Sequence, residues 1–369
     1  MRKMSGDDQL RALIESARQA MKVVRNKSEL LDIVQTFADY KGKLRIENKA
    51  LKYTSLLGIG LAAVALIDNY LLGPSLLLVS TAQDWGVPTS FVAWIFAGPI
   101  LVPTIFNIAM VIGDSKEIPE LSKELARRSS WFTNGLVETD TPLEPLLEQL
   151  QRSFNDYSRG NYSRKIQRAL KGRHAGTRQT LEYLFIDLEY VEKRQETYTT
   201  TDSKGSTTIR TRTVFDHHQR YSLVVGFPWM RGIAVRGDLQ DGIDYPNKYQ
   251  TSSTAFNEVF TLSGTTAMDC ARFAKPVTVL HLLSMKTGLH SLNLEFAADG
   301  AGLCISFDND ITDFDMPCDL STPGAFFQHL DSGIALPTLT RLLEAIHVLV
   351  EQHDDNFELS NQPNMQMEQ

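Results

Sequence analysis

The chain is richest in possible metal ligands between residues 306 and 319, where the sequence reads SFDNDITDFDMPCD. Five aspartates lie in it: Asp308, Asp310, Asp313, Asp315 and Asp319. Clustered carboxylate oxygens are the ligands that calcium and magnesium take in proteins. The segment lacks the glycine and the distal glutamate of an EF-hand loop, so we interpret it as a solvated turn and predict no metal site there.

Imidazole and thiolate groups are placed no better for a transition metal. Cys270, Cys304 and Cys318 form no C-x-x-C pair, and their odd number argues against a disulfide framework. Glu344 and His347 have the i, i+3 spacing of a carboxylate-bridged iron helix, but the apolar residues of that helix define the opposite face. We therefore expect Glu344, His347 and Glu351 to be solvated.

The sequence also lacks the signatures of common catalytic and nucleotide-binding sites. It has no G-x-S-x-G elbow, no Walker loop and no glycine-rich dinucleotide turn. With 37 Lys and Arg against 44 Asp and Glu, the formal charge of −7 argues against a nucleic-acid partner. The sequence thus assigns no reaction, no catalytic residue and no cofactor.

The basic residues most suited to an intermolecular contact lie in a threonine-rich hairpin. Arg210 and Arg212 share one face of a predicted strand, and Lys204 lies at the predicted turn. This arrangement suits an acidic partner or lipid head groups. A polar, exposed hairpin without a partner explains the same residues equally well.

Two apolar runs predict a membrane-spanning hairpin over residues 53–112. Residues 91–112 contain no charge over 22 positions, and a helix of that length spans about 33 Å against a hydrocarbon core of about 30 Å. Residues 53–72 form a second, weaker span that Asp68 and Asn69 interrupt. Gly58 and Ala62 have small-x-x-x-small spacing, and Gly98 is one candidate for the opposite surface.

Three polar residues lie within these spans: Asp68, Asn69 and Asn107. A carboxylate at the centre of a span costs roughly 2.5 to 3.5 kcal/mol, so a buried Asp68 would indicate a functional site. Asp68 lies about 22 Å along a helix that starts near Tyr53. We therefore expect it at the outer interface, with a proton or ion pathway as the alternative.

Charge around the spans predicts their orientation. Five basic residues precede the first span, and several follow the second, whereas residues 73–90 between them contain no Lys or Arg. The positive-inside rule then places both termini in the cytoplasm. About fifty polar and charged residues precede the first span, so we expect no signal peptide.

The remaining pattern predicts an α+β protein. We expect cytoplasmic amphipathic helices over residues 1–52, a helical connector over 113–160, a cytoplasmic antiparallel-sheet domain with helices over 161–353, and a disordered tail over 354–369. In the domain, two strands flank a turn at residues 202–205, short strands follow at 221–225 and 232–235, and helices alternate with strands up to an amphipathic helix at 337–353. His217 and His218 are expected in a loop at a strand end.

The order of these parts resembles a known family. Two adjacent spans are followed by Leu170-Lys171-Gly172, a strand ending in Leu188-Glu189-Tyr190, and a threonine-rich hairpin running into Val214-Phe215. The segment from Tyr249 to Ser253 and the residues Phe256, Phe260, Asp269, Ala271, Phe273 and Pro276 continue the match. The chain resembles the bacterial domain-of-unknown-function family three-one-three-seven over about residues 50 to 320. Asp216-His217-His218 replaces the family's glycine after the Val-Phe pair. The resemblance implies a bacterial inner-membrane protein, without an activity to transfer.

The sequence therefore favours a multi-pass inner-membrane protein that presents a cytoplasmic interaction or regulatory domain. Its expected partners are the lipid bilayer and either another protein or further copies of itself. A membrane-tethered enzyme, possibly metal-dependent, and an oligomeric transport element are the alternatives. A deep pocket with converging His and carboxylate groups would favour the enzyme, and polar residues facing a shared lumen would favour transport.

Overall fold

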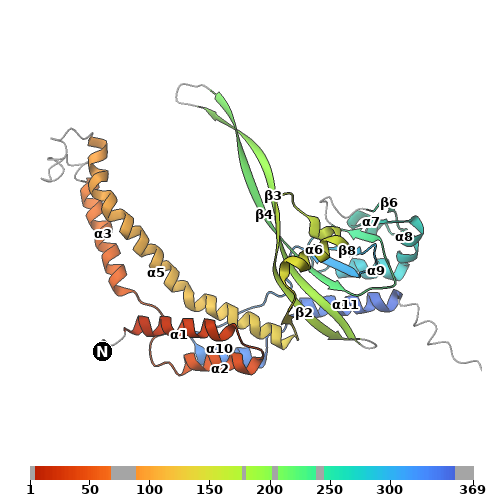
Figure 1. The fold of residues 1–369 in the computed structure, drawn as a ribbon, viewed down its shortest axis with the longest axis horizontal. Helices are drawn as coiled ribbons and strands as arrows, with labels where there is room; N and C mark the ends of the chain where they lie inside the picture. The colour runs from red at the N-terminus through yellow and green to blue at the C-terminus, as the bar shows by residue number, and fades with distance from the viewer. Residues whose placement is uncertain (1–4, 68–88, 177–179, 202–206, 238–244, 354–369) are drawn as a thin grey trace, which may run out of the picture. The chain divides into compact units, whose positions relative to one another are not determined.

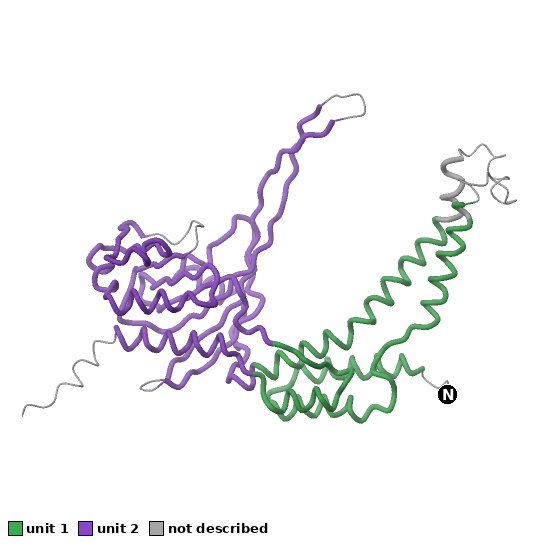
Figure 2. Tube along the Cα trace, turned by 180° about the vertical axis from the view of Figure 1, so that it is seen from behind, with its two compact units in different colours: residues 1–130, 315–334 green, residues 131–314, 335–369 purple. Residues whose placement is uncertain are grey.

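A computed structural model describes residues 5–67, 89–176, 180–201, 207–237 and 245–353. The chain forms two compact units (Figure 2). Unit 1 comprises residues 1–130 and 315–334, and unit 2 comprises residues 131–314 and 335–369. Each unit is thus built from two separate stretches of the chain. The described residues form an α+β protein, as the sequence predicts.

Unit 2 is organised around a nine-stranded antiparallel sheet with the order β1-β2-β3-β4-β9-β8-β5-β7-β6 (Figure 1). The strands are β1 (Val137–Glu138), β2 (Ser163–Ala175), β3 (Thr180–Thr201), β4 (Thr207–Val225), β5 (Ile233–Arg236), β6 (Asn247–Tyr249), β7 (Thr261–Gly264), β8 (Asn293–Phe296) and β9 (Leu303–Phe307). The long central strands β3 and β4 connect the β1-β2 edge to the shorter strands from β9 to β6.

One face of the sheet is covered by helices that come late in the chain. They are α7 (Thr254–Val259), α8 (Ala267–Phe273), α9 (Pro276–Met285) and α11 (Pro337–His353). Leu342, Ile346 and Leu349 of α11 belong to the same buried apolar cluster as Phe185 and Leu223 of the sheet. The i, i+3, i+4 spacing of the α11 leucines explains why this helix buries one face against the strands.

The other face is covered by two elements that precede β2. Helix α6 (Leu143–Ser153) and the 3-10 helix η2 (Asn155–Ser158) carry Leu146, Leu150 and Tyr157 into a second apolar cluster. That cluster contains Ile186 and Leu188 of β3. The sheet is therefore buried on both faces between β2 and β9, which explains why residues 183 to 191 of β3 alternate so little in polarity.

The structure confirms the predicted hairpin and corrects its surroundings. Strands β3 and β4 stay in register from Tyr183↔Val225 to Thr201↔Thr207 without a bulge. Residues 221–225, predicted as a separate strand, are the end of β4, and His217 and His218 lie inside β4, because they pair with Val191 and Tyr190 of β3. The predicted turn at residues 202–205 and the predicted tail at 354–369 lie outside the described residues.

Unit 1 is a helical assembly. It comprises α1 (Gly6–Met21), α2 (Lys27–Ala38), α3 (Lys49–Ile67), the part of α5 (Thr89–Thr133) that ends at Ser130, and α10 (Pro323–Ser332). The spacing of Leu10, Ile14, Ala17, Met21 and Val24 predicts one stripe of a helix. The first four are buried on α1, whereas Val24 lies beyond the end of this helix and is half-buried. Asn26 caps α2 by accepting a hydrogen bond from the Glu29 amide at 2.9 Å.

Two helical stretches are long and apolar enough to be candidate membrane spans, namely Gly98–Thr133 and Pro323–His353. Only 6% of the apolar window in the first stretch is buried, against 50% in the second. The second stretch is divided into α10 and α11, which bury their apolar faces in the cores of their own units. That burial is typical of a core helix, so the case for a membrane depends on α3 and α5.

The compact units differ from the domains expected from the sequence. Residues 315–334, expected within the 161–353 domain, belong to unit 1, because α10 packs against α2 and buries Phe326 and Leu330. Residues 131–160, expected in a connector, belong to unit 2. They contribute strand β1 and the cover formed by α6 and η2, so the sheet is incomplete without them.

This difference predicts how two fragments behave. A fragment of residues 131–353 should unfold cooperatively, whereas residues 161–353 should lose at least about 5 kcal/mol of unfolding free energy, because several leucine-sized side chains lose their cover at roughly 1.5–3 kcal/mol each. Thermal denaturation followed by circular dichroism compares the two, and α10 is common to both. Equal midpoints and cooperativity would show that α6 and η2 are dispensable.

Candidate functional site

A hairpin arm extends from the sheet of unit 2 (Figure 1). Pairing of β3 with β2 ends at Val191↔Ser163, and pairing of β4 with β9 ends at Tyr221↔Phe307. Beyond these points the two strands pair with each other alone as far as Thr201↔Thr207. We call residues 192–201 and 207–219 the ribbon. At about 3.3 Å per residue, its β3 strand is about 30 Å long.

The root of the ribbon is fixed by a buried arginine. Arg220 is 2% exposed, and its Nη1 donates to Asp308 Oδ1 at 2.6 Å. Its Nη2 donates to the Ser291 carbonyl at 2.9 Å and to Ser306 Oγ at 3.0 Å. Its Nε donates to Asp156 Oδ2 at 3.4 Å. A buried guanidinium needs such partners, because an unpaired buried charge is very costly.

Asp156 extends this network into η2. It is 3% exposed and also accepts from Arg159 Nε at 2.5 Å. Burial opposes ionisation of this carboxyl group, but the positive charges of Arg220 and Arg159 outweigh it and hold the pKa of Asp156 below its usual value. The ionised Asp156 therefore links η2 to the root of the ribbon.

Glu295 on β8 holds the start of the same 3-10 helix. Its carboxyl oxygens accept from the backbone amides of Asn155 and Asp156 at 2.8 and 3.1 Å, and from Asn155 Nδ2 at 3.0 Å. Glu295 is 1% exposed, and burial raises its pKa to about 7. Residues 155–161 have loop composition, which gives no sign of this network. A charged residue inside the apolar strand LNLEF was the available signal.

The two faces of the ribbon differ in chemistry, because alternate residues of a strand point to opposite faces. One face carries the charged residues, and cross-strand ion pairs join them: Arg194 Nε to Asp216 Oδ2 at 2.5 Å, and Arg212 Nη2 to Glu196 Oε2 at 2.6 Å. The hydrogen bond from Arg194 holds the pKa of Asp216 below its usual value. These pairs are solvent-exposed, so each contributes little to stability.

The other face is almost uncharged and rich in threonine. It comprises Lys193, Gln195, Thr197, Thr199 and Thr201 of β3, with Thr207, Ile209, Thr211, Thr213 and Phe215 of β4. Ile209 is 71% exposed and Phe215 is 44% exposed. Because one long hairpin is marginally stable on its own, a ribbon with open edges and an exposed β-branched face is suited to binding another molecule.

The structure places only two of the three predicted interaction residues. Arg210 and Arg212 lie on one face of β4, as expected, and opposite Tyr198 and Glu196 of β3. Arg212 forms the ion pair with Glu196, whereas among the described residues no carboxylate forms an ion pair with Arg210. Lys204 lies outside the described residues.

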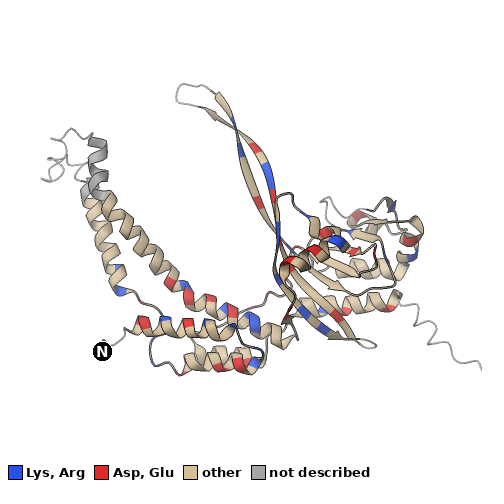
Figure 3. Ribbon diagram, in the orientation of Figure 1, with Lys and Arg blue, Asp and Glu red and all other residues tan. Residues whose placement is uncertain are grey.

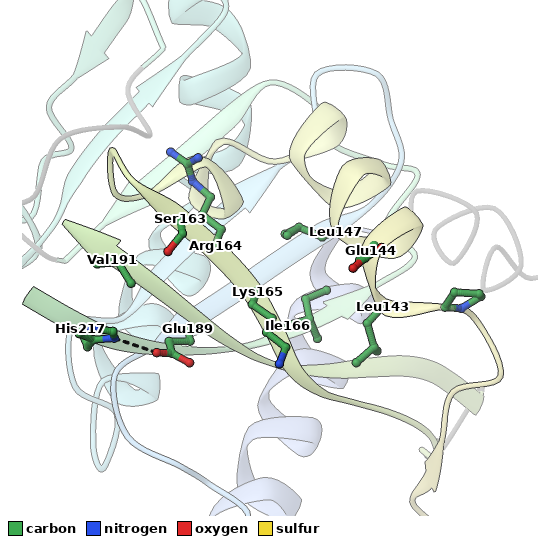
Figure 4. A pocket seen from close by; sticks show the side chains of 11 residues that line it. Leu143, Glu144, Leu147, Ser163, Arg164, Lys165, Ile166, Glu189, Val191 and His217 are labelled. Atoms are coloured by element: carbon green, nitrogen blue, oxygen red, sulfur yellow. Dashed lines mark hydrogen bonds and ion pairs between the residues drawn. The ribbon is translucent and has the colours of Figure 1, made fainter. Parts of the chain in front are cut away.

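A hollow of about 690 Å³ lies beside the root of the ribbon (Figure 4). Leu143 and Leu147 of α6 line one part of it, and the Glu189–His217 pair lines another, with Nδ1 and Oε1 2.9 Å apart. The hydrogen bonds from His217 and Gln167 hold the pKa of Glu189 below its usual value. Register places Lys165 on the face of Glu189 and Ile166 on the opposite face with Leu188. The hollow therefore follows the edge of β2, and its polar groups do not converge as in a catalytic pocket.

The acidic segment is engaged by the protein's own groups. Asp308 pairs with Arg220, and Asp310 pairs with Arg168 at 2.9 Å and accepts from the Thr312 amide at 2.8 Å. Asp319 accepts from the Ser321 amide at 2.8 Å. Within the described residues, no group of three or more His, Cys, Asp or Glu side chains is arranged to hold a metal ion.

One prediction about the last helix is wrong. His347 was expected to be solvated, but it is buried at 6% exposure, and its Nε2 lies 3.1 Å from Glu351 Oε1. Glu344 is exposed, as expected. Packing on two sides of α11 explains the burial, since Gly176 after β2 lies directly against the His347 ring.

Small and polar side chains of α3 face α5. Ser55, Gly58 and Ala62 are buried, and a Cβ atom on Gly58 would lie 2.1 Å from Thr104 Oγ1. Gly98 was one candidate for the opposite surface, but among the described residues nothing lies within 4 Å of a Cβ atom placed on Gly98, and Thr104 lies against Gly58 instead. Asn107 Nδ2 donates to Thr54 Oγ1 at 3.4 Å, whereas Asp68 and Asn69 lie outside the described residues.

The charged end of this helix pair is tied to α1. Arg11 donates to Asp114 Oδ2 at 2.6 Å and to Asn48 Oδ1 at 2.9 Å, and Asn48 Nδ2 donates to the same Asp114 oxygen at 2.6 Å. Asn48 has a positive φ of 45°, which asparagine tolerates better than most residues. This cluster fixes the start of α3 beside α5 where the charged part of α5 begins.

Comparisons of the chain with protein-family models, curated proteins and solved structures find no match. The resemblance to the bacterial family three-one-three-seven stays a prediction that depends on the residues quoted for it.

The raised pKa of Glu295 allows a test of the network at the root of the ribbon. Unfolded Glu295 ionises near pH 4.5 and folded Glu295 near pH 7, so its contribution to stability is fully present below pH 4.5 and declines as the pH rises through 7. The stability advantage of wild type over Glu295→Gln should fall by up to about 3 kcal/mol across this interval. Urea denaturation of the 131–353 fragment at several pH values measures it. If the unfolding free energies of the two proteins changed in parallel with pH, burial would not be raising the pKa of Glu295.

Proposed function

We propose that this protein is an integral membrane protein in which α3 and the N-terminal half of α5 cross the bilayer as a hairpin. Unit 2 is then a cytoplasmic interaction module whose contact element is the ribbon. The observation that carries the proposal is the exposure of large apolar side chains around both helices. The resemblance to family three-one-three-seven supports the inner membrane of a bacterium as the location.

The exposed apolar side chains occur along α5 and on the sides of α3 that do not carry Ser55, Gly58 and Ala62. They are 42% to 71% exposed and comprise Tyr53, Leu56, Leu57, Ile59, Leu61, Val64 and Ile67 of α3 and Val102, Ile105, Phe106, Met110 and Ile112 of α5. Water would disfavour this surface by about 25 cal/mol per Å², whereas lipid would not. The small-residue contact through Gly58 is typical of helices that pack in a bilayer.

Charge supports one orientation of this hairpin. Lys49 and Lys52 lie at the start of α3, and the charged residues of α5 begin at Asp114 (Figure 3). The Asp114, Arg11 and Asn48 cluster would then lie at the cytoplasmic interface, where water and head groups stabilise charge. Both termini are cytoplasmic in this proposal, in keeping with the positive-inside rule.

The ribbon supports an interaction role over catalysis. Its exposed threonine face and open edges offer backbone and side-chain hydrogen bonds to another molecule. By contrast, the Glu189–His217 pair in the hollow beside β2 and the aspartates of the acidic segment are bonded to groups of the protein itself. A reaction would need converging groups that the described residues do not bring together.

The topology is tested by cysteine labelling. With Cys318 replaced by alanine, Thr89→Cys should react with a membrane-impermeant maleimide in intact cells, because residue 89 lies at the outer end of the hairpin. Gln195→Cys in the exposed ribbon should react only after lysis. The buried Cys270 and Cys304 provide a low background. Equal labelling of both sites before lysis, or release of the protein by alkaline carbonate, would reject the membrane hairpin.

The packing of the hairpin is tested by two glycines on α3. Gly58→Leu should destabilise the detergent-solubilised protein by about 1–3 kcal/mol, because the new side chain displaces Thr104. Gly60→Leu is the matched control, since nothing lies within 4 Å of its Cβ position. A thermal shift in detergent measures both. The same midpoint for the two variants would mean that α3 and α5 do not pack through Gly58.

A further inference from the structure

Along the ribbon, none of the described strands pairs with the outer edge of β4. In an antiparallel ladder, alternate residues direct their backbone groups to the same neighbour. The Val191 carbonyl accepts from the Tyr162 amide at 3.1 Å, and the Asn161 side chain bonds both backbone groups of Lys193, at 2.7 and 3.1 Å. The odd-numbered residues of β3 therefore point away from β4. By register, the odd-numbered residues of β4 point away from β3.

The open positions on β4 form an unbroken series. They are Ile209, Thr211, Thr213, Phe215 and His217, and pairing with β9 begins only at Tyr221. Within the described residues the ribbon has no proline and no bulge, the devices with which proteins usually block an edge strand. An edge of this length and β-branched composition is a template for another strand.

We propose that this edge pairs with the same edge of a second copy of the chain, antiparallel, about a two-fold axis beside Thr213. The inference rests on the proposed function, in which the ribbon is the contact element, and it names the partner. Two hairpins would then form one four-stranded sheet. About ten backbone hydrogen bonds would join the open positions.

Charge selects this register. A two-fold axis normal to the sheet keeps each residue on its own face, so one residue must meet its own copy at the centre. With Thr213 at the centre, Arg210 lies opposite the partner's Asp216, and the contact occurs twice. Thr211 lies opposite the partner's Phe215, a favourable pairing of a β-branched with an aromatic side chain. Arg210, which has no ion pair among the described residues, gains one.

Neighbouring registers are less favourable. A centre at Arg212 sets Arg212 opposite its own copy, and like charges directly opposite are destabilising. A centre at Val214 sets Arg212 opposite the partner's Asp216, but both already form ion pairs within their own hairpin, and Arg210 gains none. It also sets Thr207 opposite the partner's Tyr221, whose strand is already paired with β9 at that position. Among these registers, Arg210 therefore gains an ion pair only when Thr213 is at the centre.

The outer edge of β3 is a poorer candidate. Its open positions start at Gln195, because Asn161 already holds the backbone groups of Lys193. A centre at Gln195 would bring Arg194 opposite the partner's Glu196, but it needs those same groups of Lys193. With Thr197 at the centre, the inner pairs do not involve Lys193. No charged residue then lies opposite a partner residue of opposite charge. The open edge of β4 is longer than that of β3, and its charges are complementary to those of a second copy.

Two prolines on opposite edges test the proposal. Thr213→Pro removes an amide that points away from β3, so the hairpin keeps its own ladder, but the edge is blocked at the two-fold axis. Thr197→Pro is the matched control on the β3 edge. In full-length protein in detergent, we expect wild type and Thr197→Pro to sediment as dimers, and the dissociation constant of Thr213→Pro to rise roughly 100-fold or more. Circular dichroism checks that both variants fold.

A second measurement does not depend on a proline. Across a hydrogen-bonded pair, the two Cα atoms at position 213 would be about 5.5 Å apart, within the range of a disulfide. With Cys318 replaced by alanine, Thr213→Cys should cross-link between copies in isolated membranes under mild oxidation, and Thr197→Cys should not.

The outcomes separate this inference from the proposed function. A monomeric wild type, equal effects of the two prolines, or equal cross-linking at both positions would overturn the β4 interface, even if the ribbon bound another protein. Extraction by alkaline carbonate is measured on the same samples. Release of a protein that still dimerises would overturn the membrane hairpin and leave the interface standing.

Discussion

The folding of unit 2 depends on keeping one buried positive charge paired. Arg220 lies where β4 leaves the sheet and becomes the ribbon, and its guanidinium is held by groups from η2, β9 and the loops before β8 and after β9. Removing one partner of such a buried pair typically costs about 3–5 kcal/mol, because the remaining charge stays desolvated. The cover of the sheet and the direction of the ribbon are therefore set by the same side chain.

This arrangement lets a long hairpin leave the sheet without losing its orientation. Two strands alone are marginally stable, but β3 and β4 are clamped at their root by β2, β9 and the Arg220 network. Their register continues unbroken into the solvent-exposed part. The ribbon thus presents two chemically different faces, one with charged pairs and one with threonines, in a fixed relation to the module.

The sequence pattern predicts a helix or strand well where the polarity of its side chains matches their burial. Periodicity within one segment predicts the stripe on α1, the threonine-rich hairpin and the leucine face of α11. Residue type predicts the cap at Asn26. Residues 155–161 have loop composition, and their burial depends on Arg220 and Glu295, more than sixty positions away. Composition places His217 in a loop, yet pairing with β3 extends strand β4 through it. Such features are set by partners distant in sequence.

The same limit applies to unit 1 and to the helix pair. Composition alone predicts an apolar hairpin, but not that Thr104, one turn and a half beyond Gly98, meets Gly58, because this depends on how the two helices are offset. Similarly, α10 contributes Phe326 and Leu330 to a core whose other members lie in the first third of the chain. Sequence proximity assigned it to the wrong domain.

The placement of α10 has a consequence for the order of events during synthesis. At 5–20 residues per second, roughly 15 to 60 s separate the emergence of α2 from that of α10. During that interval the face of α2 that α10 covers is without its final partner, while the helices after it are already being made. Completion of unit 1 thus waits until residues 315–334 have been translated.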